Sequence, residues 1–158
     1  MTEWRHDSGY WVSDDPTLLD VGRVHHWLST LSYWARGRHP DRTRTAIANS
    51  LNLGLYDESG TQVGFCRWVT DAATFAWLCD VFVDPDVRGN GLGTFLVGVA
   101  CSHPRVRDLR LLLGTADAHE LYRKFGFAAV DKPERLMEVR RDGAPPAPRP
   151  RQGKARAR

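Results

Sequence analysis

Apolar residues recur at helical spacing in three parts of the chain. From Pro16 to Trp34 they fall every three or four positions, which predicts one helix. Pro40 suits the first turn of a second helix that runs to about Leu51. A third helix is predicted after a glycine-rich turn by a stripe of residues on one face. The members of that stripe are Leu92, Phe95, Leu96, Val99 and Ala100.

Shorter apolar runs bounded by turn residues predict strands. Residues 9–13 form a first short strand, and residues 53–71 form a hairpin around an Asp-Glu-Ser-Gly turn. Residues 74–83 and 109–113 are two further strands. Residues 127–139, interrupted by Asp-Lys-Pro-Glu, are expected to give the last strand or two. Helices and strands therefore alternate along one domain of mixed α/β type.

Composition places the chain among ordinary globular proteins. It has 158 residues, of which 42% are hydrophobic and 26% charged. No apolar run reaches the 18 or so residues that a membrane span needs, so no membrane partner is expected. The N-terminal residues carry early charges and no apolar leader, so we expect a cytoplasmic protein. The three cysteines are odd in number and far apart, which favours free thiols in or near the core.

The formal charge of +3 is unevenly distributed. Residues 142–158 hold five basic residues and one acidic residue, or +4, which leaves −1 for the rest of the chain. Because this segment is rich in Pro, Ala and Arg, we expect a domain over residues 1–141 and a disordered basic tail. Without aromatic residues the tail is better explained as a solvated extension than as a nucleic-acid arm. The near-neutral domain also makes nucleic acid an unexpected partner.

The segment from Asp80 to Ala100 combines a strand, a glycine-rich turn and a helix. The strand ends at Val83, and Asp84-Pro85 closes it. Backbone N–H groups at a helix start can bind an anion, and glycines let the backbone approach it closely. Arg88 adds a planar charged group that suits phosphate. A glycine-rich cap without a ligand is the alternative interpretation.

The spacing of these glycines excludes two common phosphate loops. A dinucleotide fingerprint would need glycine at position 94 or 96, where Thr94 and Leu96 stand. No Lys-Ser or Lys-Thr pair follows, so the segment is not a nucleotide-triphosphate loop either.

The segment resembles the acyl-CoA loop of the GNAT N-acetyltransferase superfamily. The family motif is Arg/Gln-x-x-Gly-x-Gly/Ala behind a strand that ends in Val-x-Pro. Here Val-Asp-Pro at 83–85 precedes Arg-Gly-Asn-Gly-Leu-Gly at 88–93. A second family block, Ala-x-x-Leu-Tyr-x-x-x-Gly-Phe, matches residues 118–127 in the family's order. The resemblance is specific over residues 74–130 and does not cover the tail.

The resemblance implies a fold and an activity. The GNAT fold has a central, mostly antiparallel, twisted sheet of six to seven strands, splayed between strands four and five and flanked by about four helices. The implied function is transfer of an acetyl group from acetyl-CoA to a primary amine, here of a small molecule, by direct attack in a ternary complex. Residues implied in acetyl-CoA binding are Phe82, Val83, Arg88, Gly89, Asn90, Gly91, Leu92, Gly93, Thr94, Thr115 and Phe125.

The second block lies on a helix predicted over Asp117–Phe125. Asp117 and Glu120 are spaced as a capping box, and Gly126 follows as the residue that ends the helix. The resemblance makes Tyr122 the general acid, although a tyrosine on a buried helix face can be purely a core residue. Thr115 replaces the Asn that many relatives have seven residues before this tyrosine.

Other residues are candidates for the general base and for acceptor binding. Asp80, inside an apolar strand, is the preferred base, with His119 and Glu120 after it, and an ion-pair role for Asp80 is an equal alternative. Residues 32–38 and 67–77 are rich in aromatic side chains and are the implied acceptor site. With Asp71 or Asp80 they would suit a cationic amine. The residues predicted to bind the acceptor are Tyr33, Trp34, Arg67 and Trp77.

The function and the oligomeric state stay open at the level of sequence. A non-catalytic acyl-CoA-binding or regulatory domain is the alternative function, and a protein N-terminal acetylase is another. The adjacent His25 and His26 do not converge on a helix, so no metal is assigned. The oligomeric state is undetermined, with a homodimer as one option.

Overall fold

The computed structural model describes residues 1–139, so the predicted basic tail lies outside the described residues. Two compact units are distinguished: one spans Met1–Ala128 and the other begins at Ala129. The described part of the second unit contains only a short 3-10 helix, η4 (Pro133–Arg135). The strands predicted within residues 127–139 are therefore wrong, because no strand follows Leu113 in the described chain. Lys132 and Pro133 interrupt the apolar pattern there, and proline cannot donate to a strand ladder.

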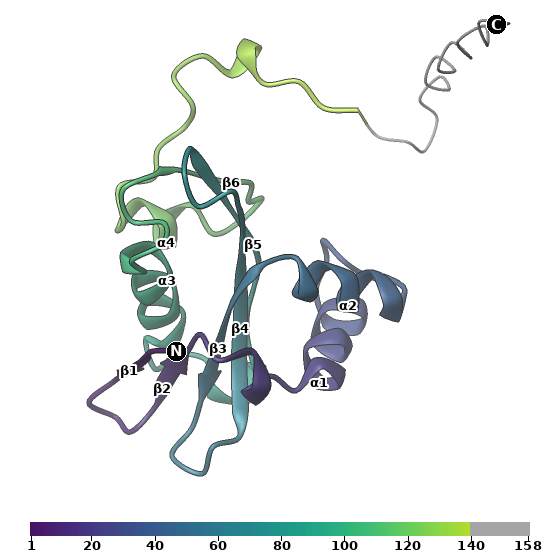
Figure 1. The fold of residues 1–158 in the computed structure, drawn as a ribbon, viewed down its shortest axis with the longest axis vertical. Coiled ribbons are helices and arrows are strands. Elements are labelled where there is room, and N and C mark those ends of the chain that lie inside the picture. Colours follow the sequence, from purple (N-terminus) through teal and green to yellow (C-terminus); the bar gives the residue numbers. More distant parts are fainter. Residues whose placement is uncertain (140–158) are drawn as a thin grey trace, which may run out of the picture. The chain divides into compact units, whose positions relative to one another are not determined.

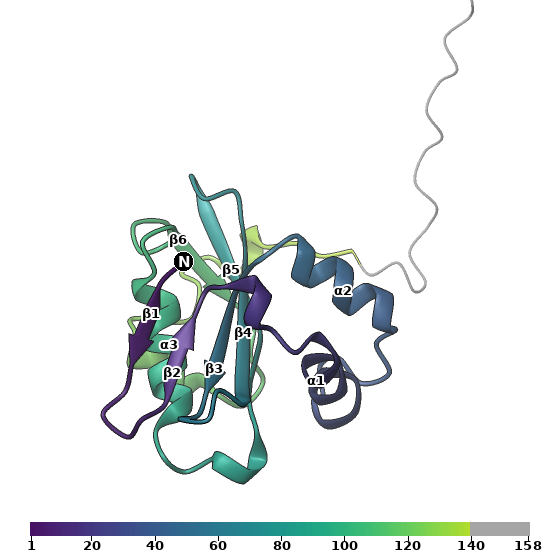
Figure 2. The same ribbon diagram turned by 60° about the horizontal axis from the view of Figure 1, so that its bottom comes forward.

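A six-stranded sheet forms the centre of the first unit (Figures 1 and 2). Its strands lie in sequence order and all neighbours are antiparallel except the last pair, β5 and β6. This confirms the expected mixed, mostly antiparallel fold, with one addition at the N-terminus that was not predicted. The strands are β1 (Glu3–Arg5), β2 (Trp11–Ser13), β3 (Leu51–Tyr56), β4 (Gln62–Thr70), β5 (Phe75–Val83) and β6 (Arg110–Leu113).

Helices cover both faces of this sheet (Figure 1). On one face lie α1 (Val21–His26) and α2 (Pro40–Ala48), and on the other lie α3 (Leu92–Ser102) and α4 (His119–Arg123). The single helix predicted over residues 16–34 is divided. A 3-10 turn, η1 (Pro16–Leu18), precedes α1, and a π-helical turn, η2 (Trp27–Leu31), follows it. Asp20 caps α1 by accepting from the Arg23 N–H at 2.8 Å, which explains why the α-helix begins only there.

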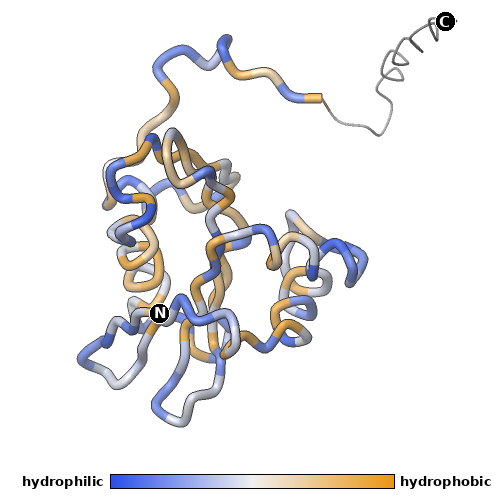
Figure 3. Tube along the Cα trace, viewed as in Figure 1, coloured by the Kyte–Doolittle hydropathy of each residue, from blue (hydrophilic) through white to orange (hydrophobic). Residues whose placement is uncertain are grey.

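Two apolar clusters hold these layers together. The larger one lies between the sheet and α3 and contains residues of both, such as Trp68, Leu78 and Leu96. The Trp68 indole donates to the Ala100 carbonyl at 3.0 Å, so this buried ring has its polar atom satisfied. The smaller cluster lies under α1, where Trp27 stacks on Phe82. In Figure 3 the hydrophobic segments follow the central strands and α3, while the N-terminal hairpin and the turn between β3 and β4 are more hydrophilic.

A β-bulge in β5 changes which residues face each layer. Phe65 pairs with Phe82 but Arg67 pairs with Cys79, so β5 carries an extra residue at this point. Asp80 lies in the bulge with a φ of 53°, an unusual value for a residue other than glycine. Because one residue is inserted, the alternation of side chains shifts. Leu78 packs toward α3, whereas Asp80 and Phe82 both face the α1 and α2 layer.

The sheet opens beyond this bulge. β5 pairs with β6 only from Phe75 to Leu78, and the partner of Leu78 is Leu113, the last residue of β6. This opening is the splay expected between strands four and five. It lies between β5 and β6 because the unpredicted strand β1 shifts the strand numbers by one. The splay matters because side chains from both sheet faces and from the following loop meet there.

Over residues 1–139 no helix is both long and apolar enough to cross a bilayer.

Candidate active site

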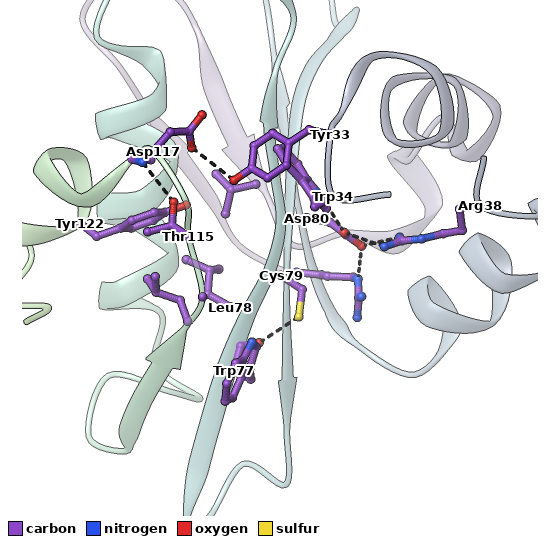
Figure 4. A pocket seen from close by; sticks show the side chains of 15 residues that line it. Tyr33, Trp34, Arg38, Trp77, Leu78, Cys79, Asp80, Thr115, Asp117 and Tyr122 are labelled. Atoms are coloured by element: carbon purple, nitrogen blue, oxygen red, sulfur yellow. Dashed lines mark hydrogen bonds and ion pairs between the residues drawn. The ribbon is translucent and has the colours of Figure 1, made fainter. Parts of the chain in front are cut away.

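A cavity of about 320 Å³ lies at the opening between β5 and β6 (Figure 4). Its walls come from the loop after η2, from β4 and β5, and from the segment that joins β6 to α4. The volume is within the range of small-molecule sites. The cavity brings together Tyr122, Asp80 and Thr115 with all four residues predicted to bind the acceptor. Those four are Tyr33, Trp34, Arg67 and Trp77.

Tyr122 contributes to the wall of this cavity and to the core. It is only 8% exposed and lies in the larger cluster, with its ring 6.0 Å from that of Phe127. Burial is the main cause that raises its pKa to about 12, and the negative charge of Asp117 adds to the effect. A phenol with that pKa remains protonated throughout the neutral range and can donate a proton.

The segment before α4 is held by bonds that differ from the predicted capping box. The Ala118 N–H donates to Thr115 Oγ1 at 3.1 Å, so Thr115 stabilises the start of the helix. Asp117 accepts a hydrogen bond from the Tyr33 hydroxyl at 3.3 Å, and Glu120 pairs with Arg123. The capping-box prediction is therefore wrong, because Asp117 is engaged by the facing loop. Gly126 has a φ of 85°, which confirms its predicted place at the helix end.

Asp80 is the centre of a buried polar cluster. Its side chain is 3% exposed. Arg38 donates to both oxygens, at 2.8 and 3.1 Å, Arg67 Nε donates to Oδ2 at 2.7 Å, and Trp34 donates to Oδ1 at 3.1 Å. A carboxylate offers about four acceptor positions, and all four are filled here.

The electrostatics of Asp80 follow from these bonds. Burial by itself raises the pKa of the carboxyl, but hydrogen bonds and charge from Arg38 and Arg67 outweigh it, so the pKa is lowered from its ordinary value. A carboxylate with a low pKa and no free lone pair is a poor proton acceptor. The geometry therefore favours the ion-pair alternative for Asp80 over the role of general base.

This pKa shift predicts acid sensitivity. Because the pKa of Asp80 is lower in the folded state, its contribution to stability is present above about pH 4 and is lost as the pH falls through the folded pKa. We expect the free energy of unfolding, measured by urea titration, to decline as the pH falls below about 4. The decline should be smaller in Asp80→Asn, which has no carboxylate to titrate. An equal decline in both proteins would contradict the prediction.

A second cavity, of about 310 Å³, lies over the glycine turn. Gly89 and Gly91 have φ values of 86° and 72°, which confirms the predicted left-handed backbone. The first backbone bond of α3 runs from the Phe95 N–H to the Gly91 carbonyl, and no side chain caps the helix. The N–H groups of residues 92–94 are thus the free donors expected at a helix start. A Cβ atom added at Gly89, Gly91 or Gly93 would meet nothing within 4 Å, so a ligand can approach this backbone.

Arg88 and Asn90 stabilise the turn from within. Arg88 Nε donates to the Val83 carbonyl at 2.9 Å, and its guanidinium lies 5.1 Å from the centre of the Phe82 ring. The Asn90 side chain donates to the Val87 carbonyl at 3.2 Å. Arg88 contributes to the wall of the second cavity, together with Val83, Leu92 and Thr94, whereas Asn90 does not.

Three of the residues predicted to form the site have side chains that line neither of these two cavities. The side chain of Phe82 is buried in the cluster under α1, while the role implied for this residue, that of an oxyanion donor, belongs to its backbone N–H; Phe125 packs against α3 near Gly98. Asp71 accepts hydrogen bonds from Ala73 and Thr74 in the turn between β4 and β5, and it does not line the first cavity. The cavity therefore gives no support to the role expected for Asp71 beside a cationic amine. Asp71 is a turn residue because its carboxylate satisfies backbone N–H groups locally.

Two residues that line the cavity were not predicted to belong to the site. Arg38 lay within the predicted acceptor segment, but only the fold pairs it with Asp80, 42 residues away. Asp117 lines the cavity because the Tyr33 loop reaches across to it, 84 residues away in the chain. Spacing in the sequence carries no signal for either contact.

Comparison with known proteins identifies the family of this chain. The profile of the Acetyltransferase (GNAT) domain matches residues 49–129, which is 81 of the 158 residues and just over half of the chain. The chain belongs to the GNAT family. A provisionally named acetyltransferase of Gibberella zeae is 32% identical over 137 residues, covering 73% of this chain and 76% of that protein.

Solved structures extend this GNAT relationship to the fold. A GNAT family protein of Xanthomonas campestris is 41% identical with a TM-score of 0.80, covering 83% of this chain and 92% of that one. A predicted acetyltransferase of Clostridium acetobutylicum, whose structure contains acetyl-CoA, has a TM-score of 0.61 at 14% identity, covering 83% and 94% of the two chains. The protein is thus a GNAT acetyltransferase, of a family that uses acetyl-CoA.

Proposed function

We propose that the protein transfers an acetyl group from acetyl-CoA to the primary amine of a small molecule, by direct attack in a ternary complex. The observation that carries the proposal is the cavity at the splay, where the Tyr122 phenol meets a wall of charged and aromatic side chains. The cavity is bounded by side chains on several sides, which suits a small acceptor better than a protein N-terminus.

The glycine turn is the proposed site for the pyrophosphate of acetyl-CoA. Its free N–H groups, the open space before its glycines and Arg88 supply donors and positive charge for a phosphate. Leu121 lies in the wall of the same cavity, one residue before Tyr122. We infer that the cofactor runs from this turn toward the splay, where Thr115 is the candidate contact for its pantetheine or phosphate arm.

The chemistry requires a proton acceptor and a proton donor. An ammonium group with a pKa of about 10 must lose its proton before attack, which costs about 4 kcal/mol at neutral pH. We propose that Tyr122 protonates the departing thiolate, whose pKa is about 8.5. Asp117 is the carboxylate best placed to accept the proton of the amine, because it lines the same cavity and its charge acts on Tyr122. His119 and Glu120 are exposed and do not line this cavity.

The test of this function is turnover with a panel of primary amines. The protein is incubated with acetyl-CoA and each amine, and the acetylated product is measured by mass spectrometry together with release of free thiol. We expect product with at least one small amine and a matching amount of thiol. Tight acetyl-CoA binding without product from small amines or N-terminal peptides would favour the non-catalytic alternative. Product from peptides alone would favour the N-terminal acetylase.

The glycine turn can be tested separately. Gly93→Val is expected to weaken acetyl-CoA binding by at least about tenfold, because the new side chain would occupy the space next to the backbone donors. Gly93 lies in the helix and needs no left-handed backbone, so the variant should melt within a few degrees of the wild type. Calorimetric titration with acetyl-CoA and a thermal melt measure the two quantities. Unchanged affinity in this folded variant would show that the turn does not hold the cofactor.

A further inference from the structure

The cavity at the splay has a surplus of buried positive charge at one end. The side chains of Arg38 and Arg67 are 20% and 12% exposed, and both pair with the single carboxylate of Asp80. Two guanidinium groups and one carboxylate leave one positive charge without a partner in the cluster. An unpaired charge that is largely removed from water is unfavourable, so this end of the cavity favours a ligand that brings a negative charge.

The two guanidinium groups also have hydrogen-bond donors to spare. Each arginine has five N–H donors. Arg38 uses two of them, both toward Asp80. Arg67 uses Nε toward Asp80 and Nη1 toward Ser50. Within residues 1–139 no other acceptor contacts these groups, and both side chains line the cavity. Because the bonds to Asp80 fix both groups, the remaining donors are held in place for an incoming oxyanion.

The opposite end of the same cavity carries negative charge, from Asp117. Asp117 and Tyr122 lie on one side in Figure 4, across the cavity from Arg38 and Asp80. Asp117 is held there by the Tyr33 hydroxyl. The cavity is therefore dipolar, with a carboxylate beside the phenol at one end and the arginine pair at the other.

We propose that the acceptor is an amine that also carries a small oxyanion, a carboxylate or a phosphate, and that Arg38 and Arg67 bind this oxyanion. The amine then lies at the end formed by Asp117 and Tyr122, where acetyl transfer takes place. This inference rests on the proposed function. It also replaces the expectation of a simple cationic amine beside Asp80, because the charge of Asp80 is already committed to the two arginines.

The anion site can be tested by binding, without turnover. The protein is saturated with CoA, so that the glycine turn is occupied, and titrated calorimetrically with 3-phenylpropionate and with its neutral amide. A second arm compares phenyl phosphate with phenol. We expect at least one anion to bind about tenfold or more tightly than its neutral partner, as expected for hydrogen bonds to charged groups. The preference should disappear in Arg67→Gln and persist in Arg36→Gln, an exposed arginine of the same loop that does not line the cavity.

Two results would overturn the anion site. One is equal binding of each anion and its neutral partner to the wild type. The other is a preference that survives in Arg67→Gln, since the anion would then bind elsewhere. A thermal melt of Arg67→Gln accompanies the titration. If that variant unfolds, Arg38→Gln replaces it, because Arg38 is the more exposed of the two and its loss removes only bonds to Asp80.

Turnover separates this inference from the proposed function. The amine panel includes phenylalanine with phenethylamine, and phosphoethanolamine with ethanolamine. A higher kcat/KM for the member of a pair that carries the carboxylate or phosphate, reduced by Arg67→Gln, supports the inference. Faster acetylation of phenethylamine and ethanolamine, which lack an oxyanion, would overturn the inference and leave the proposed function intact. Anion binding that depends on Arg67, without acetylation of any amine, would overturn the proposed function and leave the anion site.

Discussion

Replacing Tyr122 with Phe is expected to lower kcat by at least about 100-fold. The substitution keeps the ring, and with it the packing in the larger cluster and against Phe127, and removes only the hydroxyl. General acids contribute about 10²–10⁴-fold, because without them the thiolate must depart unprotonated. Acetyl-CoA affinity should change by well under about 1 kcal/mol, since one hydrogen bond to sulfur contributes little. Steady-state kinetics and calorimetry measure the two effects.

The controls for Tyr122→Phe separate chemistry from stability. A near-normal kcat would indicate that water protonates the thiolate or that product release conceals the step, and rapid-quench single-turnover measurement distinguishes these. Loss of acetyl-CoA binding together with a lower melting temperature would mean that Tyr122 is only a core residue. Phe127→Leu, which alters the neighbouring ring without touching the hydroxyl, is the matched control. It should change kcat much less than Tyr122→Phe.

Replacing Asp80 with Asn is expected to destabilise the protein by about 3 kcal/mol. The change leaves two largely buried guanidinium groups without a negative charge, and breaking a buried ion pair from one side typically costs about 3–5 kcal/mol. For a domain of this size we expect the melting temperature to fall by about 6–12 °C. Asp41→Asn, which removes an exposed acid paired with Arg44, should change it by little.

The Asp80→Asn variant also distinguishes two roles for this residue. If Asp80 only positions the arginines, the double variant Asp80→Asn/Arg67→Gln should lose less stability than the sum of the single changes, because one unpaired charge is removed. If Asp80 were the general base, Asp80→Asn would keep its melting temperature and lose kcat, most strongly at low pH, where the amine is protonated. That outcome would restore the role first expected from the sequence.

The two motifs of the sequence determined the family and the proposed cofactor turn. The glycine turn could be predicted because its function depends on local backbone properties, and the left-handed values at Gly89 and Gly91 follow from the residue type. Tyr122 could be placed for a similar reason, since its helix face and the glycine that ends the helix are encoded within ten residues. The strands of the central sheet other than β1 followed from their apolar runs and turns.

The acceptor end of the site was decided by the tertiary structure alone. Asp80 is an acid in an apolar strand, and its sequence neighbours do not show that Arg38, Arg67 and Trp34 will fill its four acceptor positions. The bulge that turns Asp80 toward α1 and α2 is a property of strand pairing, which depends on the register of two strands. The sequence by itself thus specified which family the chain belongs to and where its cofactor turn lies. The charge of the cavity, and with it the kind of acceptor it favours, arises only when segments 42 and 84 residues apart are packed together.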